Sequence, residues 1–142
     1  MENQEFHSLL LRVYNHTNRR ITEQTGRLGL FPGQPKVLEY LLLHDGCISR
    51  DICTGCVLDK STMTSLLTRM EGQGLITKAA HAADKRAVCV YLTEKGRELA
   101  KRVRSITCSI DETALSGFPD EKKEAFLNAL SEIMKHLEEP LT

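Results

Sequence analysis

The sequence lacks several features that would place it in common classes of protein. No run of about 18 apolar residues occurs in its 142 residues, so no helix is expected to cross a membrane. The start of the chain, residues 1–5, has no basic segment leading into an apolar one, so no signal peptide is expected. It also has no glycine-rich phosphate loop, no serine nucleophile elbow and no HExxH spacing among its five histidines. We therefore expect a cytoplasmic protein that is not an enzyme.

A net charge is missing as well, because 19 Lys and Arg balance 19 Asp and Glu. The balance is not uniform along the chain: residues 59–104 hold ten basic and five acidic side chains, whereas residues 111–139 hold three and eight. A positive field over one segment attracts phosphates. The distribution therefore favours nucleic-acid binding by residues 59–104, although the net charge by itself argues against it.

A hydroxyl-rich amphipathic helix is predicted after Asp59. This residue is a good N-cap, since its carboxylate can accept backbone N–H groups of the first turn. Apolar side chains follow at the spacing that defines one buried face: Met63, Leu66, Leu67 and Met70. The remaining side chains are short and polar, with one long cation: Ser61, Thr62, Thr64, Ser65, Thr68 and Arg69. Short donors and acceptors suit base edges in a DNA groove, but a merely solvated face has the same composition.

A two-stranded hairpin is predicted after this helix, which Gly72 and Gly74 are expected to end. Two segments rich in apolar and β-branched residues, 75–77 and 87–92, predict the strands. The loop between them, residues 78–86, is small and cationic, and its Lys85 and Arg86 can supply charge to phosphates or to a minor groove. His81 in the same loop can contact phosphate or face water, and we expect it to face water.

These segments resemble the MarR family of winged helix-turn-helix transcription regulators. The hairpin loop matches the family's Asp-x-Arg signature with Asp84-Lys85-Arg86, and residues 92–96, Leu-Thr-Glu-Lys-Gly, follow it directly. Further matches lie at the start of the second helix and at both ends of the recognition helix: residues 31–34, 59–64 and 74–76. The resemblance covers nearly the whole chain. The chain departs from the family at Val57, where glycine often makes the turn, and before Asp84, where the wing has no arginine.

The resemblance implies a mainly α-helical fold with a small β-wing. Residues 35–104 would form the DNA-binding winged helix, and residues 1–30 and 105–142 would supply dimerisation helices. The sequence is consistent with a dimer, because the segments 1–28 and 119–141 are both predicted to be amphipathic helices outside the winged-helix unit. The alternative is that these two helices cover the core of a monomer.

The function that the resemblance implies is a homodimeric repressor bound to double-stranded DNA at an inverted-repeat operator. The major groove would then face Ser61, Thr62, Thr64, Ser65, Thr68 and Arg69, whereas Lys85 and Arg86 would serve the wing. Asp84 would orient these two cations by ion pairing. The family also implies release from DNA by a small aromatic effector, although no residue identifies it, and no cofactor is expected.

Five cysteines leave other functions open. An odd number without a secretion signal argues against a disulfide framework. Cys53 and Cys56 form a CxxC pair, which with His44 and Cys47 could bind zinc or sense redox conditions. On the family pattern the pair falls at apolar packing positions, so we expect it to be structural. The alternatives are a cysteine-based redox or metal sensor and a winged-helix protein-interaction module.

Overall fold

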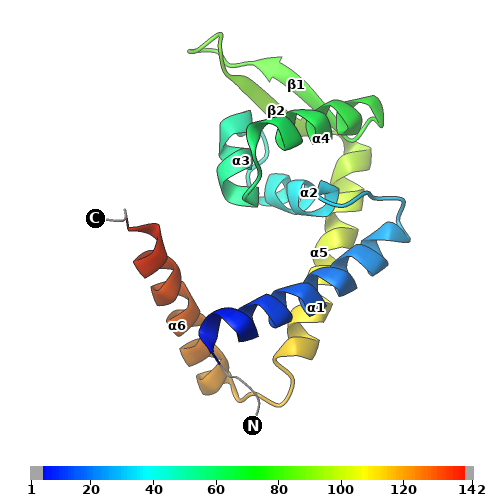
Figure 1. Cartoon of the computed structure of the whole chain (residues 1–142). Coiled ribbons are helices and arrows are strands. Elements are labelled where there is room, and N and C mark those ends of the chain that lie inside the picture. The colour runs from blue at the N-terminus through cyan, green and yellow to red at the C-terminus, as the bar shows by residue number, and fades with distance from the viewer. Residues whose placement is uncertain (1–4, 140–142) are drawn as a thin grey trace. The chain divides into compact units, whose positions relative to one another are not determined.

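The computed structural model describes residues 5–139 and is mainly helical, with one small antiparallel hairpin (Figure 1). The elements follow the predicted order: α1 (Phe6–Gly26), α2 (Gln34–Leu43), α3 (Ser49–Cys56), α4 (Lys60–Gly72), β1 (Ile76–Ala80), β2 (Val88–Leu92), α5 (Glu94–Ala114) and α6 (Asp120–Glu138). The chain forms two compact units that divide after Ile110. Across the described range, no helix is both long and apolar enough to span a bilayer. The predicted fold class, mainly α with a small β-wing, is confirmed.

The core of the first unit lies where α2, α3 and α4 pack together with the hairpin. Pro35 sits in the first turn of α2, where the missing N–H of proline leaves no helical hydrogen bond unmade. One side of this helix is fully buried: Val37, Leu38 and Leu41. The predicted apolar stripe of α4 is confirmed, because Leu66 packs against the core and three of its residues are buried: Met63, Leu67 and Met70.

A buried amide pair joins the start of α2 to the end of α4. The side chain of Gln34 is fully buried, accepts the N–H of Phe31 at 3.0 Å and donates to Gln73 Oε1 at 2.9 Å. A buried amide without such partners would destabilise the fold, so the pair fixes the register of α4 on α2.

The hairpin is longer than the sequence predicts. Ile76 lies opposite Leu92 and Ala80 lies opposite Val88, so residues 78–80 belong to β1 and the tip is limited to residues 81–87. The prediction that the loop begins at Lys78 was wrong, because the small residues there are held by the partner strand and not by their own strand propensity. At the other edge of β2, the N–H of Val90 donates to the carbonyl of Cys47 at 2.9 Å. The base of the hairpin is thereby attached to the chain just before α3.

The junction between the hairpin and α5 explains the segment Leu-Thr-x-x-Gly at residues 92–96. Thr93 caps α5, since its Oγ1 accepts the N–H of Gly96 at 3.0 Å and donates to the carbonyl of Gly74 at 2.6 Å. Gly96 meets the backbone of Leu75 so closely that a Cβ atom would lie 2.0 Å from the Leu75 carbonyl oxygen. Leu92 is buried in the core. This segment therefore needs an apolar residue, a capping hydroxyl and a residue without a side chain.

The turn between α3 and α4 contains a backbone outlier at Val57. Its φ and ψ are 54° and 56°, the left-handed conformation that β-branched residues avoid. Leu58 N–H donates to the Cys53 carbonyl at 2.9 Å, which closes the helix end in the manner of a Schellman motif. Glycine is usual at this position, so the departure noted at Val57 is a local strain. At the other end of α3, Ile48 occupies the N-cap position and Ser49 is the first helical residue.

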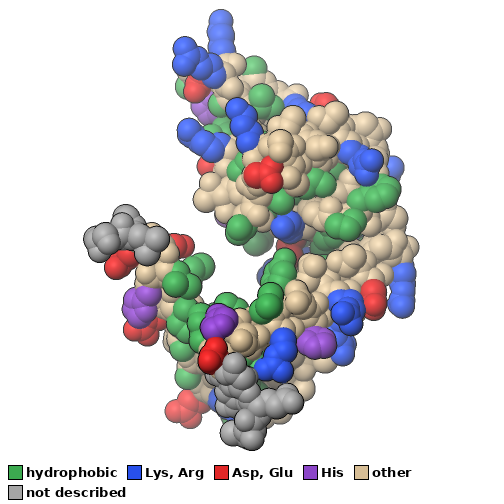
Figure 2. Space-filling view, viewed as in Figure 1, with side chains coloured by type: hydrophobic (Ala, Val, Ile, Leu, Met, Phe, Trp, Pro, Cys, Tyr) green, Lys and Arg blue, Asp and Glu red, His purple; other side chains and the backbone are tan. Residues whose placement is uncertain are grey.

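Two helices present uncovered apolar faces. In α1 only Thr25 is buried, and large apolar side chains near its start are exposed: Phe6, Leu9, Leu10, Val13 and Tyr14. In the second unit, α6 begins after Pro119 as predicted and has no buried residue, and its stripe is exposed at Phe126, Leu127, Leu130, Met134 and Leu137. Hydrophobic side chains are visible along each of these helices in Figure 2. The expected outer ends, residues 1–4 and 140–142, lie outside the described residues, and dimerisation remains a prediction.

Candidate nucleic-acid interface

The start of α4 is held by Asp59, as predicted. Its Oδ1 accepts the backbone N–H of Thr62 at 2.7 Å and the hydroxyl of Ser61 at 2.8 Å, and its Oδ2 accepts the hydroxyl of Thr62 at 2.8 Å. These bonds stabilise the carboxylate and lower the pKa of Asp59, the backbone N–H of Thr62 contributing most. The hydroxyl protons of Ser61 and Thr62 are therefore used within the cap, and only their lone pairs remain for another donor.

The outward face of α4 forms a shallow polar groove. It has a volume of about 650 Å³ and is lined by Lys60, Ser61, Thr64, Ser65 and Thr68. Thr64 donates its hydroxyl to the Lys60 carbonyl at 2.9 Å. The hydroxyls of Ser65 and Thr68 make no hydrogen bond with the part of the chain that the structure describes, and both residues are exposed. These two hydroxyls can therefore both donate and accept, which is what recognition of a base edge requires.

Arg69 lies toward the far end of the same helix and outside the groove. Its guanidinium carbon is 4.5 Å from the centre of the Phe31 ring, within the range of a cation–π contact. Phe31 belongs to the loop before α2, so this contact connects the predicted DNA-facing arginine to a second element. The guanidinium still has donors at its edge, because stacking uses only its flat face.

The hairpin tip presents the predicted cations but orients them differently from the prediction. Lys85 and Arg86 are exposed, as expected. Asp84 accepts the backbone N–H of Arg86 at 2.9 Å, and its own carbonyl accepts the N–H of Ala87 at 3.0 Å. Among the described residues Asp84 makes no ion pair, so the expected ion-pairing role is corrected: Asp84 orients Arg86 through the backbone.

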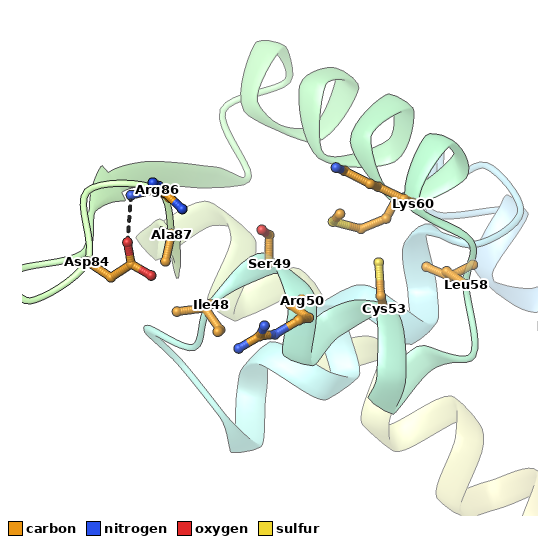
Figure 3. A pocket seen from close by; sticks show the side chains of 10 residues that line it. Ile48, Ser49, Arg50, Cys53, Leu58, Lys60, Asp84, Arg86 and Ala87 are labelled. Carbon is orange, nitrogen blue, oxygen red and sulfur yellow. Dashed lines mark hydrogen bonds between the residues drawn. The ribbon is translucent and has the colours of Figure 1, made fainter.

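A second cavity, adjoining the groove, lies between the hairpin and the starts of α3 and α4 (Figure 3). Its volume is about 670 Å³, and three cations from three different elements line it together with one acid: Arg50, Lys60, Arg86 and Asp84. Ser49 and Cys53 point into it from α3, and Lys60 extends over it from α4. No side chain caps α3, so its first backbone N–H groups add a partial positive charge. We call this cavity the basic cleft.

Sequence reasoning did not select Ser49, Arg50 or Lys60 as site residues. The available signal was modest, since each of the three lies in the first turn of α3 or α4 and no local pattern marks it. Lys60 matters most, because it lines both the groove and the basic cleft and so connects them. In Figure 2 basic side chains are visible around the hairpin and the adjoining helices of the first unit.

The cysteines that the structure describes are free thiols, and two of them, Cys47 and Cys56, are largely protonated at neutral pH. Burial raises the pKa of Cys47 and of Cys56 to about 11. The Cys56 thiol donates to the Lys36 carbonyl at 3.4 Å, and Cys53 packs partly against the core. Within the described range no three His, Cys, Asp or Glu side chains are placed to hold a metal ion. The structural role expected of the CxxC pair stays a prediction, which the packing of Cys56 in the core supports.

The three-helix unit, the hairpin packed on it and the polar outward helix define a winged helix-turn-helix protein. Comparison with known proteins agrees with this assignment. The model of the MarR family matches residues 28–87. The transcriptional regulator HosA of Escherichia coli is 29% identical over 134 residues, which cover 94% of this chain and 97% of HosA.

Solved structures have the same fold. S. aureus MepR in a DNA-binding conformation superposes with a TM-score of 0.84 at 25% identity, covering 94% of this chain and 100% of that chain. A putative MarR family regulator from Listeria monocytogenes, complexed with 26mer DNA, superposes with a TM-score of 0.89 at 19% identity, covering 95% of this chain and 90% of the other. In both sequence and fold, the chain is therefore similar to transcription regulators of the MarR family. These matches to transcription regulators agree with the predicted resemblance and with the prediction that the protein is not an enzyme.

Proposed function

We propose that this regulator acts as a homodimeric repressor that binds a specific sequence of double-stranded DNA. The observation that carries the proposal is the continuity of the polar groove on α4 with the basic cleft, through the shared residue Lys60. A groove with unpaired hydroxyls can discriminate bases, and an adjoining cluster of cations can hold the phosphates on either side. Two of the compared structures support the same proposal by name, because one is in a DNA-binding conformation and the other is complexed with 26mer DNA.

Within this proposal the two surfaces have different tasks. Helix α4 enters the major groove, where Ser65 and Thr68 contact base edges and Arg69 reaches a base or a phosphate. Ser61, Thr62 and Thr64 face the DNA major groove beside them. They act there as hydrogen-bond acceptors only, since their hydroxyl protons are already used within the protein. The hairpin brings Lys85 and Arg86 to the neighbouring backbone or minor groove, and Asp84 keeps the Arg86 backbone in place.

The uncovered apolar faces of α1 and α6 support the proposed homodimer, because α1 leaves six large apolar side chains exposed and α6 leaves five. Such faces are costly in water and are typical of subunit interfaces. A twofold dimer would hold two recognition helices about one DNA turn apart, so an inverted-repeat operator is expected. Light scattering at micromolar concentration should return twice the 16.0 kDa mass of the chain. A mass near that of one chain would contradict the dimer.

Two further parts of the proposal are the effector and the location. We propose that a small aromatic compound releases the protein from DNA and that the protein works in the cytoplasm, where its operator would be. Addition of phenolic or benzoic compounds to a preformed complex with labelled operator tests the first part. Release by such a compound, at a concentration that leaves the thermal stability of the protein undiminished, is the expected result.

Fluorescence anisotropy with labelled duplexes tests DNA binding directly. The duplexes are the DNA upstream of the protein's own coding sequence and a scrambled version of it, each measured at several salt concentrations. We expect Arg86→Ala to weaken binding to both and to reduce the salt slope by about one unit, because one phosphate contact is lost. We expect Ser65→Ala to cost about 1 kcal/mol with the specific duplex alone and to leave the slope unchanged, because a neutral hydroxyl releases no counterion.

A matched control is Lys101→Ala, which removes one exposed cation from α5 that lines neither the groove nor the basic cleft. It should keep the wild-type affinity and salt slope. If wild-type protein binds neither duplex at low salt, the hairpin and α4 do not form a DNA interface, and the protein-interaction module becomes the better explanation. A zinc content near one per chain, or binding that is lost with peroxide and regained with reductant, would favour the sensor that uses Cys53 and Cys56.

A further inference from the structure

The tip of the hairpin is closed by its own hydrogen bonds, and one histidine supplies two of them. The imidazole Nδ1 of His81 accepts the backbone N–H of Ala83 at 3.1 Å and that of Asp84, also at 3.1 Å. The N–H of His81 itself donates to the Ala87 carbonyl at 3.1 Å, which closes the loop at its base. His81 is thus bonded at both ends of the turn that carries Lys85 and Arg86, and the expectation that it merely faces water was wrong.

This arrangement selects one tautomer of the neutral ring. A nitrogen that accepts two N–H groups must carry a lone pair, so Nδ1 is unprotonated and the proton of the neutral ring lies on Nε2. Nε2 makes no hydrogen bond with the described residues, and the side chain remains partly exposed. The ring therefore has one nitrogen directed to the backbone of the tip and one N–H donor available to another molecule.

The neighbouring residues cannot replace His81 in this role. Ala82 and Ala83 have no polar side-chain atom, and Asp84 uses its Oδ1 on the N–H of Arg86, further along the turn. His81 and Asp84 hold successive parts of the turn. His81 binds the backbone N–H groups of residues 83 and 84, and Asp84 binds that of residue 86. The direction of Arg86 therefore depends on both side chains.

We propose that His81 is a positioning residue of the hairpin tip, whose Nδ1 holds the turn while its Nε2–H donates to a backbone phosphate of bound DNA. Only the second part of this inference, the contact between Nε2–H and phosphate, rests on the proposed DNA-binding function. The donor lies on the tip that also carries two cations, Lys85 and Arg86, so a phosphate that these attract comes within reach of a neutral N–H. A protein N–H to a phosphate is among the commonest ways in which a reader of DNA fixes its orientation.

Nuclear magnetic resonance of the free protein tests the first half without any DNA. Long-range proton–nitrogen spectra of the imidazoles, recorded well above the histidine pKa range, distinguish a ring protonated at Nε2 from one protonated at Nδ1. We expect His81 to be protonated at Nε2 alone, and the amide protons of Ala83 and Asp84 to exchange faster in His81→Ala than in wild type. A ring protonated at Nδ1, or a mixture of both forms, would overturn the inference.

Binding of three variants to the operator duplex tests the second half. His81→Ala removes both the acceptor and the donor, and we expect about a tenfold loss of affinity, which corresponds to one lost hydrogen bond and a less ordered tip. His81→Asn restores an oxygen that can accept N–H groups two and three residues ahead but does not replace the Nε2–H donor. It should therefore recover the slow amide exchange and only part of the lost affinity, and full recovery would exclude the phosphate contact. His81→Lys restores a donor and adds charge without any acceptor, so its tip amides should exchange as fast as in His81→Ala.

The control is His136→Ala, which removes an exposed histidine from α6 and should leave affinity and tip exchange unchanged. If His81→Ala binds the operator as tightly as wild type, the positioning role is excluded even if the ring has the expected tautomer. If wild-type protein binds no duplex, the proposed function fails, whereas the tautomer and the exchange rates still decide whether His81 holds the turn.

Discussion

Replacing Val57 by glycine should stabilise this protein. Val57 is the residue after α3, and it adopts φ 54° and ψ 56° where glycine has no steric cost. Its side chain is 87% exposed, so very little packing is lost when it is removed. The substitution therefore isolates the backbone strain from the contacts of the side chain.

The expected magnitude follows from three contributions. Release of a β-branched residue from the left-handed conformation should gain about 1–3 kcal/mol. The greater freedom of glycine in the unfolded chain should cost about 0.5–1 kcal/mol. Loss of the small buried part of the valine side chain should cost a few tenths of a kcal/mol, roughly 15 Å² at about 25 cal/mol per Å². The net gain should be about 1 kcal/mol, equivalent to a rise of about 3 °C in Tm for a chain of this size.

Urea unfolding at a fixed protein concentration, followed by circular dichroism, measures this difference. Val57→Asn should give part of the gain, because asparagine tolerates the left-handed conformation better than valine. Val88→Gly is the opposite control, since Val88 lies in β2 opposite Ala80 and glycine should weaken the strand by about 1 kcal/mol. A Val57→Gly protein that is less stable than wild type would refute the strain argument and would indicate that the valine side chain makes a contact the fold needs.

The remaining predictions concern the hairpin junction, the helix cap and the thiols. Gly96→Ala should destabilise by about 3 kcal/mol in urea unfolding, because its Cβ would lie 2.0 Å from the Leu75 carbonyl oxygen, whereas Gly72→Ala, with nothing within 4 Å, should be neutral or slightly stabilising. Wild type should exceed Asp59→Asn in Tm at neutral pH, and the difference should vanish as the pH falls below about 4. The reason is that the folded pKa of Asp59 is lowered, so its stabilisation is present above the unfolded pKa and is lost as the carboxylate is protonated. Peroxide or a chelator should leave DNA affinity within about twofold, because burial raises the pKa of Cys47 and Cys56 to about 11 and keeps these thiols protonated; a larger, reductant-reversible loss would contradict this.

Much of the candidate site could be predicted because its signals are local. The N-cap at Asp59, the apolar stripe of α4 and the polar face opposite it depend on residues three or four positions apart, and this spacing is a property of any α-helix. Exposure of the cations Lys85 and Arg86 follows in the same way from their place in a short loop. The roles of individual hydroxyls could not be predicted, because whether Ser61 or Ser65 keeps a free proton depends on the geometry of the cap.

The sequence by itself determined the element order, the resemblance to the MarR family and the location of the recognition helix and hairpin. Periodicity and short motifs can be recognised in the sequence because they do not depend on long-range packing. Only the tertiary structure decided which distant residues meet. Arg50, Lys60 and Arg86 form one basic cleft because α3, α4 and the hairpin pack around a common core, and no local pattern relates these three positions. The same holds for Gly96 beside Leu75, since a requirement for a missing side chain becomes visible only when another backbone occupies its place. Local chemistry thus selects the elements, whereas burial of their apolar faces against one another decides which polar groups share a site.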